Sequence, residues 1–329
     1  MIGSDRKALS RWLYGVTGLI LGGAALVVSL RGVAWETLTA VMRDVRWPWF
    51  GLAVVCSVLV ACLKAVRWHR LLAPNLPDLR WPLTLATLIL AQTLNLAVPI
   101  RGLGETLRVG MLSRKTGGHV LQIGGTLILE KALDTLSLAL LGVVLAPMLM
   151  AMVESAWVSR LLILTAVIGI GLFLVVRFHR ATLGWLKRWP RLSRWLDRLL
   201  SGLDALRSQS RGWEIAGWTA AVRAVSVVSS FLGLRAVRVG VPLRGLVALD
   251  IFLNLSFLLP SPPGLIGVVQ YLCILVLGFF GVARAQALVA GMLLNVIIVA
   301  PVLLLAAPAW LHVTMRAPAP AVTGEDDRA

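Results

Sequence analysis

Residues 98–109 place three ionisable side chains, Arg101, Glu105 and Arg108, directly after a run of apolar residues. In a helix the three would share one face, because their spacing is i, i+4 and i+7, and Glu105 would pair with either arginine. One positive charge would then remain. A surplus arginine in a semi-buried place suits an anionic group such as a phosphate; an internal ion-pair lock between two helices is the alternative.

Two carboxylates, Glu130 and Asp134, lie four residues apart in a second apolar run. Carboxylates one helical turn apart repel each other unless a cation lies between them or one of them is protonated. We expect Arg101 or Arg108 to supply that cation, whereas protonation would indicate a proton-coupled step. Lys131 is expected to point elsewhere, toward the membrane interface.

Arg223 and Asp250 each interrupt a further apolar run. They are expected to pair with each other, or with Asp134 and Arg108. Ionisable groups inside a membrane are costly and usually functional, although they also hold helices together.

A group of basic residues and a tryptophan lies near the end of another apolar run, and we expect it to have a different role. Basic and tryptophan side chains at helix ends commonly anchor the helix at the membrane interface. This is the role expected for Lys64, Arg67, Trp68 and Arg70.

The amino-acid composition is that of an integral membrane protein. Hydrophobic residues make up 58% of the 329 residues, and the mean hydropathy is +0.86. The net charge of +17 suits membrane loops and anionic lipid head groups rather than nucleic acid. We therefore predict an all-α polytopic membrane protein of about eight transmembrane helices. The apolar runs are 12–30, 48–63, 83–98, 123–150, 158–177, 213–233, 246–260, 264–281 and 285–311.

Proline and glycine interrupt two of these runs, in segments 95–104 and 254–267 that are loosely alike. Broken helices are tolerated at membrane depth where they are buried in protein or line a wet cavity, and paired breaks indicate a transport site between repeats. We expect one or two broken or re-entrant segments, with hinges at Pro99, Gly102, Gly104, Pro262, Pro263, Gly264 and Gly267.

The distribution of basic residues predicts the topology. Arg6, Lys7 and Arg11 place the N-terminus in the cytoplasm, as does the arginine-rich segment 178–212, an expected amphipathic connector. An even number of crossings must separate the two, so 83–98 is expected to fold back. The chain is then one transmembrane domain, 1–315, with a disordered tail, 316–329.

Motifs of soluble enzymes are not found in the sequence. There is no phosphate-binding loop, metal-ligand spacing or nucleophile motif, and the three cysteines lie in apolar runs. We expect no catalytic residue, metal or cofactor, and movement of any cargo would be passive or ion-coupled.

At these residues the chain resembles the transmembrane region of lysylphosphatidylglycerol synthases and their stand-alone, flippase-like relatives. The similar motifs are Pro99, Gly102, Gly104, Glu105 and Arg108; Gly125, Thr126, Glu130, Lys131 and Asp134; Arg67 and Trp68; and Pro262, Pro263, Gly264, Leu265, Gly267 and Gln270. Lys131 replaces the usual arginine, Pro263 a glycine and Gln270 the usual acid, so the late motif lacks its charge.

The resemblance implies a helical bundle that handles lipids. In the full-length synthases a separate soluble domain performs aminoacyl transfer, and we do not expect that activity here. The leading hypothesis is translocation of an anionic, phosphate-bearing or polyprenyl-linked lipid across a bacterial inner membrane. A glycosyltransferase-like enzyme acting on a polyprenyl phosphate and a scaffold for lipid-biosynthesis enzymes are the alternatives. The expected head-group residues are Arg101, Glu105, Arg108, Glu130, Asp134 and Arg223.

Overall fold

The structure is a computed structural model that describes residues 20, 22–31, 33–98, 102–147, 167, 170–171, 209–256 and 262–315. The described part contains ten helices, one of them a short 3-10 helix, and no strand. This confirms the all-α fold. The helices are α2 (Trp35–Arg43), α3 (Trp47–Leu72), α4 (Trp81–Ala97), α5 (Leu103–Lys115), α6 (Val120–Val144), α10 (Gln209–Ala236), α11 (Leu243–Ser256), η2 (Pro263–Leu265), α12 (Val268–Phe279) and α13 (Arg284–Thr314).

Three described helices are long and apolar enough to cross a bilayer: α3, the Arg211–Ala236 part of α10, and α13. The bent pair Gly22–Leu30 and Trp35–Arg43 would add a fourth if it is one broken span. The fold is thus that of a polytopic membrane protein, while the number of about eight spans stays a prediction. The predicted connector up to residue 208 and the tail 316–329 lie outside the described residues.

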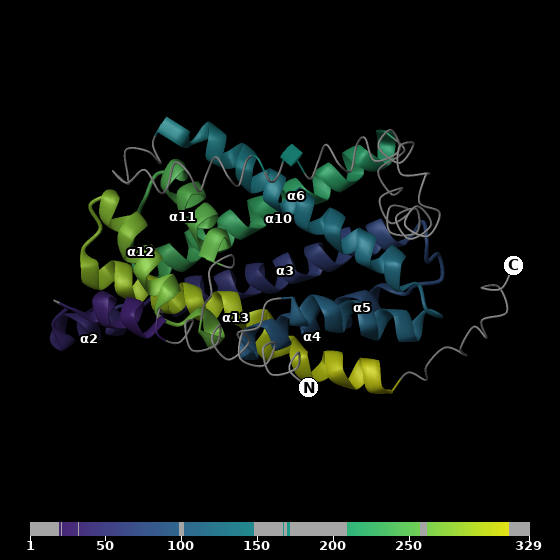
Figure 1. Cartoon of the computed structure of the whole chain (residues 1–329). Coiled ribbons are helices and arrows are strands. Elements are labelled where there is room, and N and C mark those ends of the chain that lie inside the picture. The colour runs from purple at the N-terminus through teal and green to yellow at the C-terminus, as the bar shows by residue number, and fades with distance from the viewer. Residues whose placement is uncertain are drawn as a thin grey trace, which may run out of the picture.

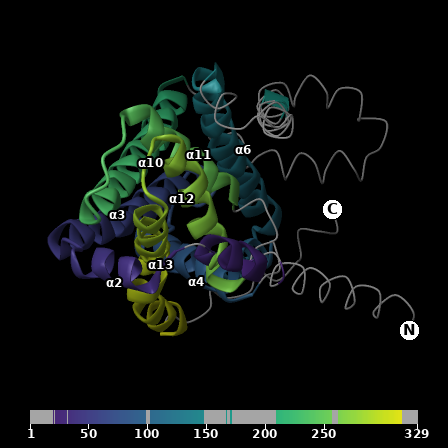
Figure 2. The ribbon, with the colours of Figure 1, turned by 90° about the vertical axis from the view of Figure 1, so that its left-hand side faces the viewer.

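The long helices form the body of the bundle. Helix α3 packs against both α10 and α13. Helix α4 packs against α13 and against α5, which lies beside it in Figure 1. Figure 2, seen along the bundle, shows α6 at the opposite side from α2 and α13. Helices α3 and α4 both begin with Trp-Pro, which suits proline because the first helical N–H groups have no intrahelical partner.

The predicted first break is confirmed between α4 and α5, which pack side by side as a hairpin. Gly102 caps α5 with a φ of 78°, a left-handed conformation that glycine adopts at little cost. Gly104 lies so close to α4 that an added Cβ would fall on the carbonyl oxygen of Ala91. Its N–H donates to Asn95 Oδ1 over 2.9 Å. Pro99 and Arg101 lie outside the described residues.

The second predicted break is also confirmed, between α11 and α12, where η2 interrupts the helices. Gly264 and Gly267 have φ values of 72° and 88°. An added Cβ at Gly267 would fall on the carbonyl oxygen of Gly22, so this turn packs tightly against the helical segment Gly22–Leu30. The segment η2 also packs against α4, the helix that precedes the first break.

The two breaks are tied down differently, although their sequences are loosely alike. Asn95 joins the two sides of the first break, whereas within the described ranges Asn254 donates to Asp250 O in its own helix. In the second break, Asn295 from α13 donates to Gly264 O over 2.9 Å. The asparagines at the start of the two segments are therefore not equivalent.

Candidate functional site

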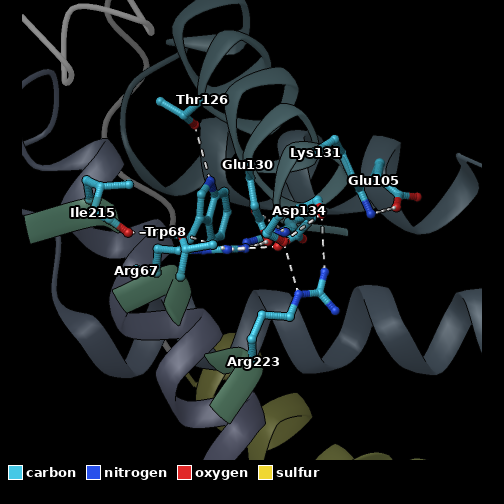
Figure 3. A network of polar contacts seen from close by, with 12 residues as sticks. Arg67, Trp68, Glu105, Thr126, Glu130, Lys131, Asp134, Ile215 and Arg223 are labelled. Atoms are coloured by element: carbon cyan, nitrogen blue, oxygen red, sulfur yellow. Dashed lines mark hydrogen bonds and ion pairs between the residues drawn. The ribbon is translucent and has the colours of Figure 1, made fainter. Parts of the chain in front are cut away.

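Arg67 lies at the centre of a polar network inside the bundle (Figure 3). Its side chain is fully buried, and its Nη1 is 2.7 Å from Asp134 Oδ1. Its Nη2 is 3.7 Å from Glu130 Oε1, and Nη1 also donates to the Thr219 hydroxyl over 3.4 Å. Arg67 therefore joins α3 to both α6 and α10, and it is the cation between the two carboxylates.

Trp68 and Arg108 form the next layer of the network. The Trp68 indole N–H donates to the Thr126 hydroxyl over 3.2 Å, and the Arg108 guanidinium carbon lies 3.3 Å from the Trp68 ring centroid. Arg108 Nη1 is 2.9 Å from Glu130 Oε2. Glu130 is thus shared by two buried arginines, and this sharing connects α5 to α3 through α6.

An outer ion pair covers the Arg108 side of the network. Lys131 Nζ is 3.1 Å from Glu105 Oε1, and Asn95 Nδ2 donates to Glu105 Oε2 over 3.2 Å. Burial alone would raise the pKa of the Glu105 carboxyl, but Lys131 and Asn95 outweigh burial and hold this pKa below its ordinary value. Lys131 remains more than half exposed, so the pair lies at the rim.

Arg223 extends the network in the other direction. Its Nε donates to the Ser137 hydroxyl over 3.0 Å, and its Nη2 donates to the Asp134 carbonyl oxygen over 3.2 Å. Its Nη1 is 3.4 Å from Asp250 Oδ2, and Ser226 donates to the other Asp250 oxygen over 2.7 Å. The predicted pairing of Arg223 with Asp250 is therefore confirmed.

The network joins five helices, α3, α5, α6, α10 and α11, through residues of alternating charge, and the step from Asp134 to Arg223 is a hydrogen bond to the Asp134 backbone carbonyl. The path runs Arg108, Glu130, Arg67, Asp134, Arg223, Asp250. Buried charges are tolerated when they are paired in this way.

Several donors in the centre of the path are nevertheless unused. The Nε and Nη2 atoms of both Arg67 and Arg108 are buried, and none of them donates a hydrogen bond to another described residue. Leaving a buried donor without a hydrogen bond costs free energy.

The structure corrects three expectations from the sequence. Arg67 and Trp68 are not interface anchors, because α6 covers the side of α3 that carries them. The cation that contacts both carboxylates is Arg67, while Arg108 contacts Glu130 alone and Arg101 lies outside the described residues. Among the described residues, Glu105 pairs with Lys131 and not with Arg108, because Arg108 turns into the bundle toward Glu130.

Five of the six expected head-group residues belong to the network, and Arg101 lies outside the described residues. Sequence reasoning did not include Arg67 among them. Its signals were its adjacency to Trp68 in a family-like Arg-Trp pair and its position five residues before the end of α3.

The chemistry available here is anion recognition. A guanidinium presents several N–H donors in a plane and binds carboxylate or phosphate oxygens in pairs. Within the described ranges, no group of three or more His, Cys, Asp or Glu residues could hold a metal ion. The carboxylates instead hold the two buried arginines in place.

Similarity to known proteins is found at the level of a family model. Neither the curated proteins nor the solved structures contain a significant match to the chain. The model of one family, the lysylphosphatidylglycerol synthase TM region, matches residues 15–306, which is most of the chain. The chain therefore belongs to the family of the lysylphosphatidylglycerol synthase transmembrane region.

Proposed function

We propose that the protein moves an anionic, phosphate-bearing lipid across the membrane, with the lipid head group bound at the network around Arg67 and Arg108. The observation that carries the proposal is the set of unused N–H donors on these two buried arginines. Membership in a lipid-related membrane family supports the same role. The location in a bacterial inner membrane, with the N-terminus in the cytoplasm, is part of the proposal.

The alternating charges offer a way to lower the cost of moving a charged head group through the bilayer. An isolated charge at the bilayer centre is strongly disfavoured. A phosphate that enters beside Arg108 and Arg67 accepts hydrogen bonds from their Nε and Nη2 atoms, which donate no hydrogen bond to another described residue. Glu130 and Asp134 keep both guanidiniums oriented meanwhile, so little reorganisation is needed.

Entry to this site requires movement of α5, because α5 carries Arg108 and packs against α4 and α6. The helix begins at Gly102, where a left-handed turn follows the first break. Besides the contact of Arg108 with Glu130, α5 is attached to α6 by the pair between Glu105 and Lys131 at the rim. We assign hinge motion to Gly102 and opening of the rim to separation of this pair.

Lipid scrambling in proteoliposomes tests the proposal. Vesicles that contain the protein are loaded with fluorescent phosphatidylglycerol, and the accessible fraction of label is followed by dithionite quenching. The wild type should move this lipid faster than protein-free vesicles do. Joint replacement of Arg108→Gln and Glu130→Gln removes one charge of each sign, and it should abolish this gain.

Two outcomes would overturn the proposal. The first is a wild-type rate equal to that of protein-free vesicles. The second is an equal rate for the wild type and the paired Arg108→Gln, Glu130→Gln variant at equal thermal stability, which would leave the network as a helix lock alone.

A further inference from the structure

Lys64 lies beside the network but does not take part in its pairs. It precedes Arg67 and Trp68 by three and four residues on α3, so the three side chains share one helical face. That face lies against α6, where Trp68 contacts Thr126 and Arg67 contacts Asp134. Earlier residues of α3 therefore lie opposite later residues of α6. Since Lys64 precedes Arg67 by about one helical turn, it lies near Asp134.

The electrostatic surroundings of Lys64 agree with this placement. The charged groups in its surroundings are Asp134, Arg223, Arg67 and Lys131. Lys64 forms neither an ion pair nor a hydrogen bond with any residue in the described part of the chain. The Asp134 carboxylate is already bonded to Arg67, and Arg223 is bonded to Asp250.

The charges of the network leave one positive charge without a carboxylate partner, and that charge belongs to Lys64. The described network and its immediate surroundings hold five cations against four carboxylates, so one positive charge remains. The cations are Lys64, Arg67, Arg108, Lys131 and Arg223, and the carboxylates are Glu105, Glu130, Asp134 and Asp250. Each cation except Lys64 has a carboxylate partner.

An unpaired ammonium in an apolar membrane helix is costly, and such a group is by default a candidate for function. Lysine suits a mobile ligand, because its ammonium is a point charge with three donors on a flexible stem. Lys64 is only half-buried, which leaves it able to meet a ligand.

We propose that Lys64 binds the phosphate of the cargo lipid, and that the surplus charge selects a head group with one net negative charge, as in a phosphodiester without an amine. This inference rests on the proposed function and names the substrate class and the recognition residue of the same site.

Binding to the purified full-length protein in neutral detergent tests the substrate class. The probes are dioctanoyl phosphatidylglycerol, dioctanoyl phosphatidylcholine and inorganic phosphate. The first should bind about tenfold more tightly than the second, which carries the same phosphate but no net charge. Equal binding of the two lipids, binding of inorganic phosphate alone, or no binding of any probe would overturn the inference.

Variants then test Lys64 itself. Lys64→Met should weaken phosphatidylglycerol binding about tenfold and leave the melting temperature unchanged or raised, because an unpaired charge is removed. Lys64→Arg should restore binding. Arg70→Met removes an exposed charge six residues further along α3, where Arg70 pairs with Glu214, and it should leave binding unchanged.

Unaltered binding by Lys64→Met would overturn the role of Lys64, and so would a lowered melting temperature, which would indicate a structural lysine. If the wild type binds phosphatidylglycerol through Lys64 but does not scramble it, the proposed transport fails while this recognition site stands.

Discussion

The guanidinium carbon of Arg108 lies 3.3 Å from the ring centroid of Trp68, which joins the short helix α5 to the long helix α3. The same indole donates to Thr126 on α6. Tryptophan is the ring that attracts a cation most strongly, and the attraction increases where water is excluded. Trp68 is fully buried, so it sets the position of Arg108 as directly as Glu130 does.

Replacement of Trp68 by phenylalanine should destabilise the protein by about 1–2 kcal/mol, because the hydrogen bond to Thr126 is lost and the attraction for Arg108 is weakened. Thermal unfolding in detergent measures the effect. Trp213→Phe is the matched control, since Trp213 is 72% exposed, and it should change little. Equal effects of the two changes would contradict the role given to Trp68.

Arg67 and Asp134 should be strongly coupled in a double-mutant cycle. Arg67→Met leaves Asp134 without its ion-pair partner, and Asp134→Asn leaves the buried Arg67 with only its longer contact to Glu130, so each should cost about 3 kcal/mol or more. The double variant should cost clearly less than the sum, because neither uncompensated charge remains. Additive losses in the free energy of unfolding would show that the pair is not energetically linked.

Gly104→Ala should disrupt the hairpin of α4 and α5, because the added methyl group meets the backbone oxygen of Ala91. We expect lower thermal stability and loss of scrambling. Gly110→Ala lies on the same helix, where nothing is within 4 Å of an added Cβ, and it should be neutral or stabilising. A neutral Gly104→Ala would mean that α5 does not depend on close contact with α4.

The rim pair should affect rate more than stability. Lys131→Gln breaks the contact with Glu105, and since Lys131 is more than half exposed, the loss in unfolding free energy should be below about 1 kcal/mol. If this pair holds α5 closed, the scrambling rate should rise. A reduced rate at unchanged stability would show instead that Lys131 takes part in transport.

The sequence predicted the architecture well because the physical signals are local. Apolar runs of bilayer length located α3, α10 and α13, and proline and glycine located both breaks. The pairing of Arg223 with Asp250 was also predictable, because an isolated charge in an apolar run requires a partner of opposite sign.

The centre of the site could not be predicted in the same way. Arg67 lies near the end of α3, where a basic residue ordinarily anchors a helix at the interface. Only the packing of α6 against that end shows that Arg67 is buried between Glu130 and Asp134. Similarly, the spacing on α5 allowed Glu105 to pair with an arginine, but the neighbouring helix offers it Lys131.

Native mass spectrometry of the purified protein tests most directly whether the network binds lipid or only locks helices together. The wild type and the Arg108→Gln, Glu130→Gln variant are compared after extraction from the same membranes, with equal melting temperatures as a condition. The wild type should retain an anionic lipid that the variant has lost. Equal retention of that lipid by both proteins would contradict a head-group site at Arg67 and Arg108.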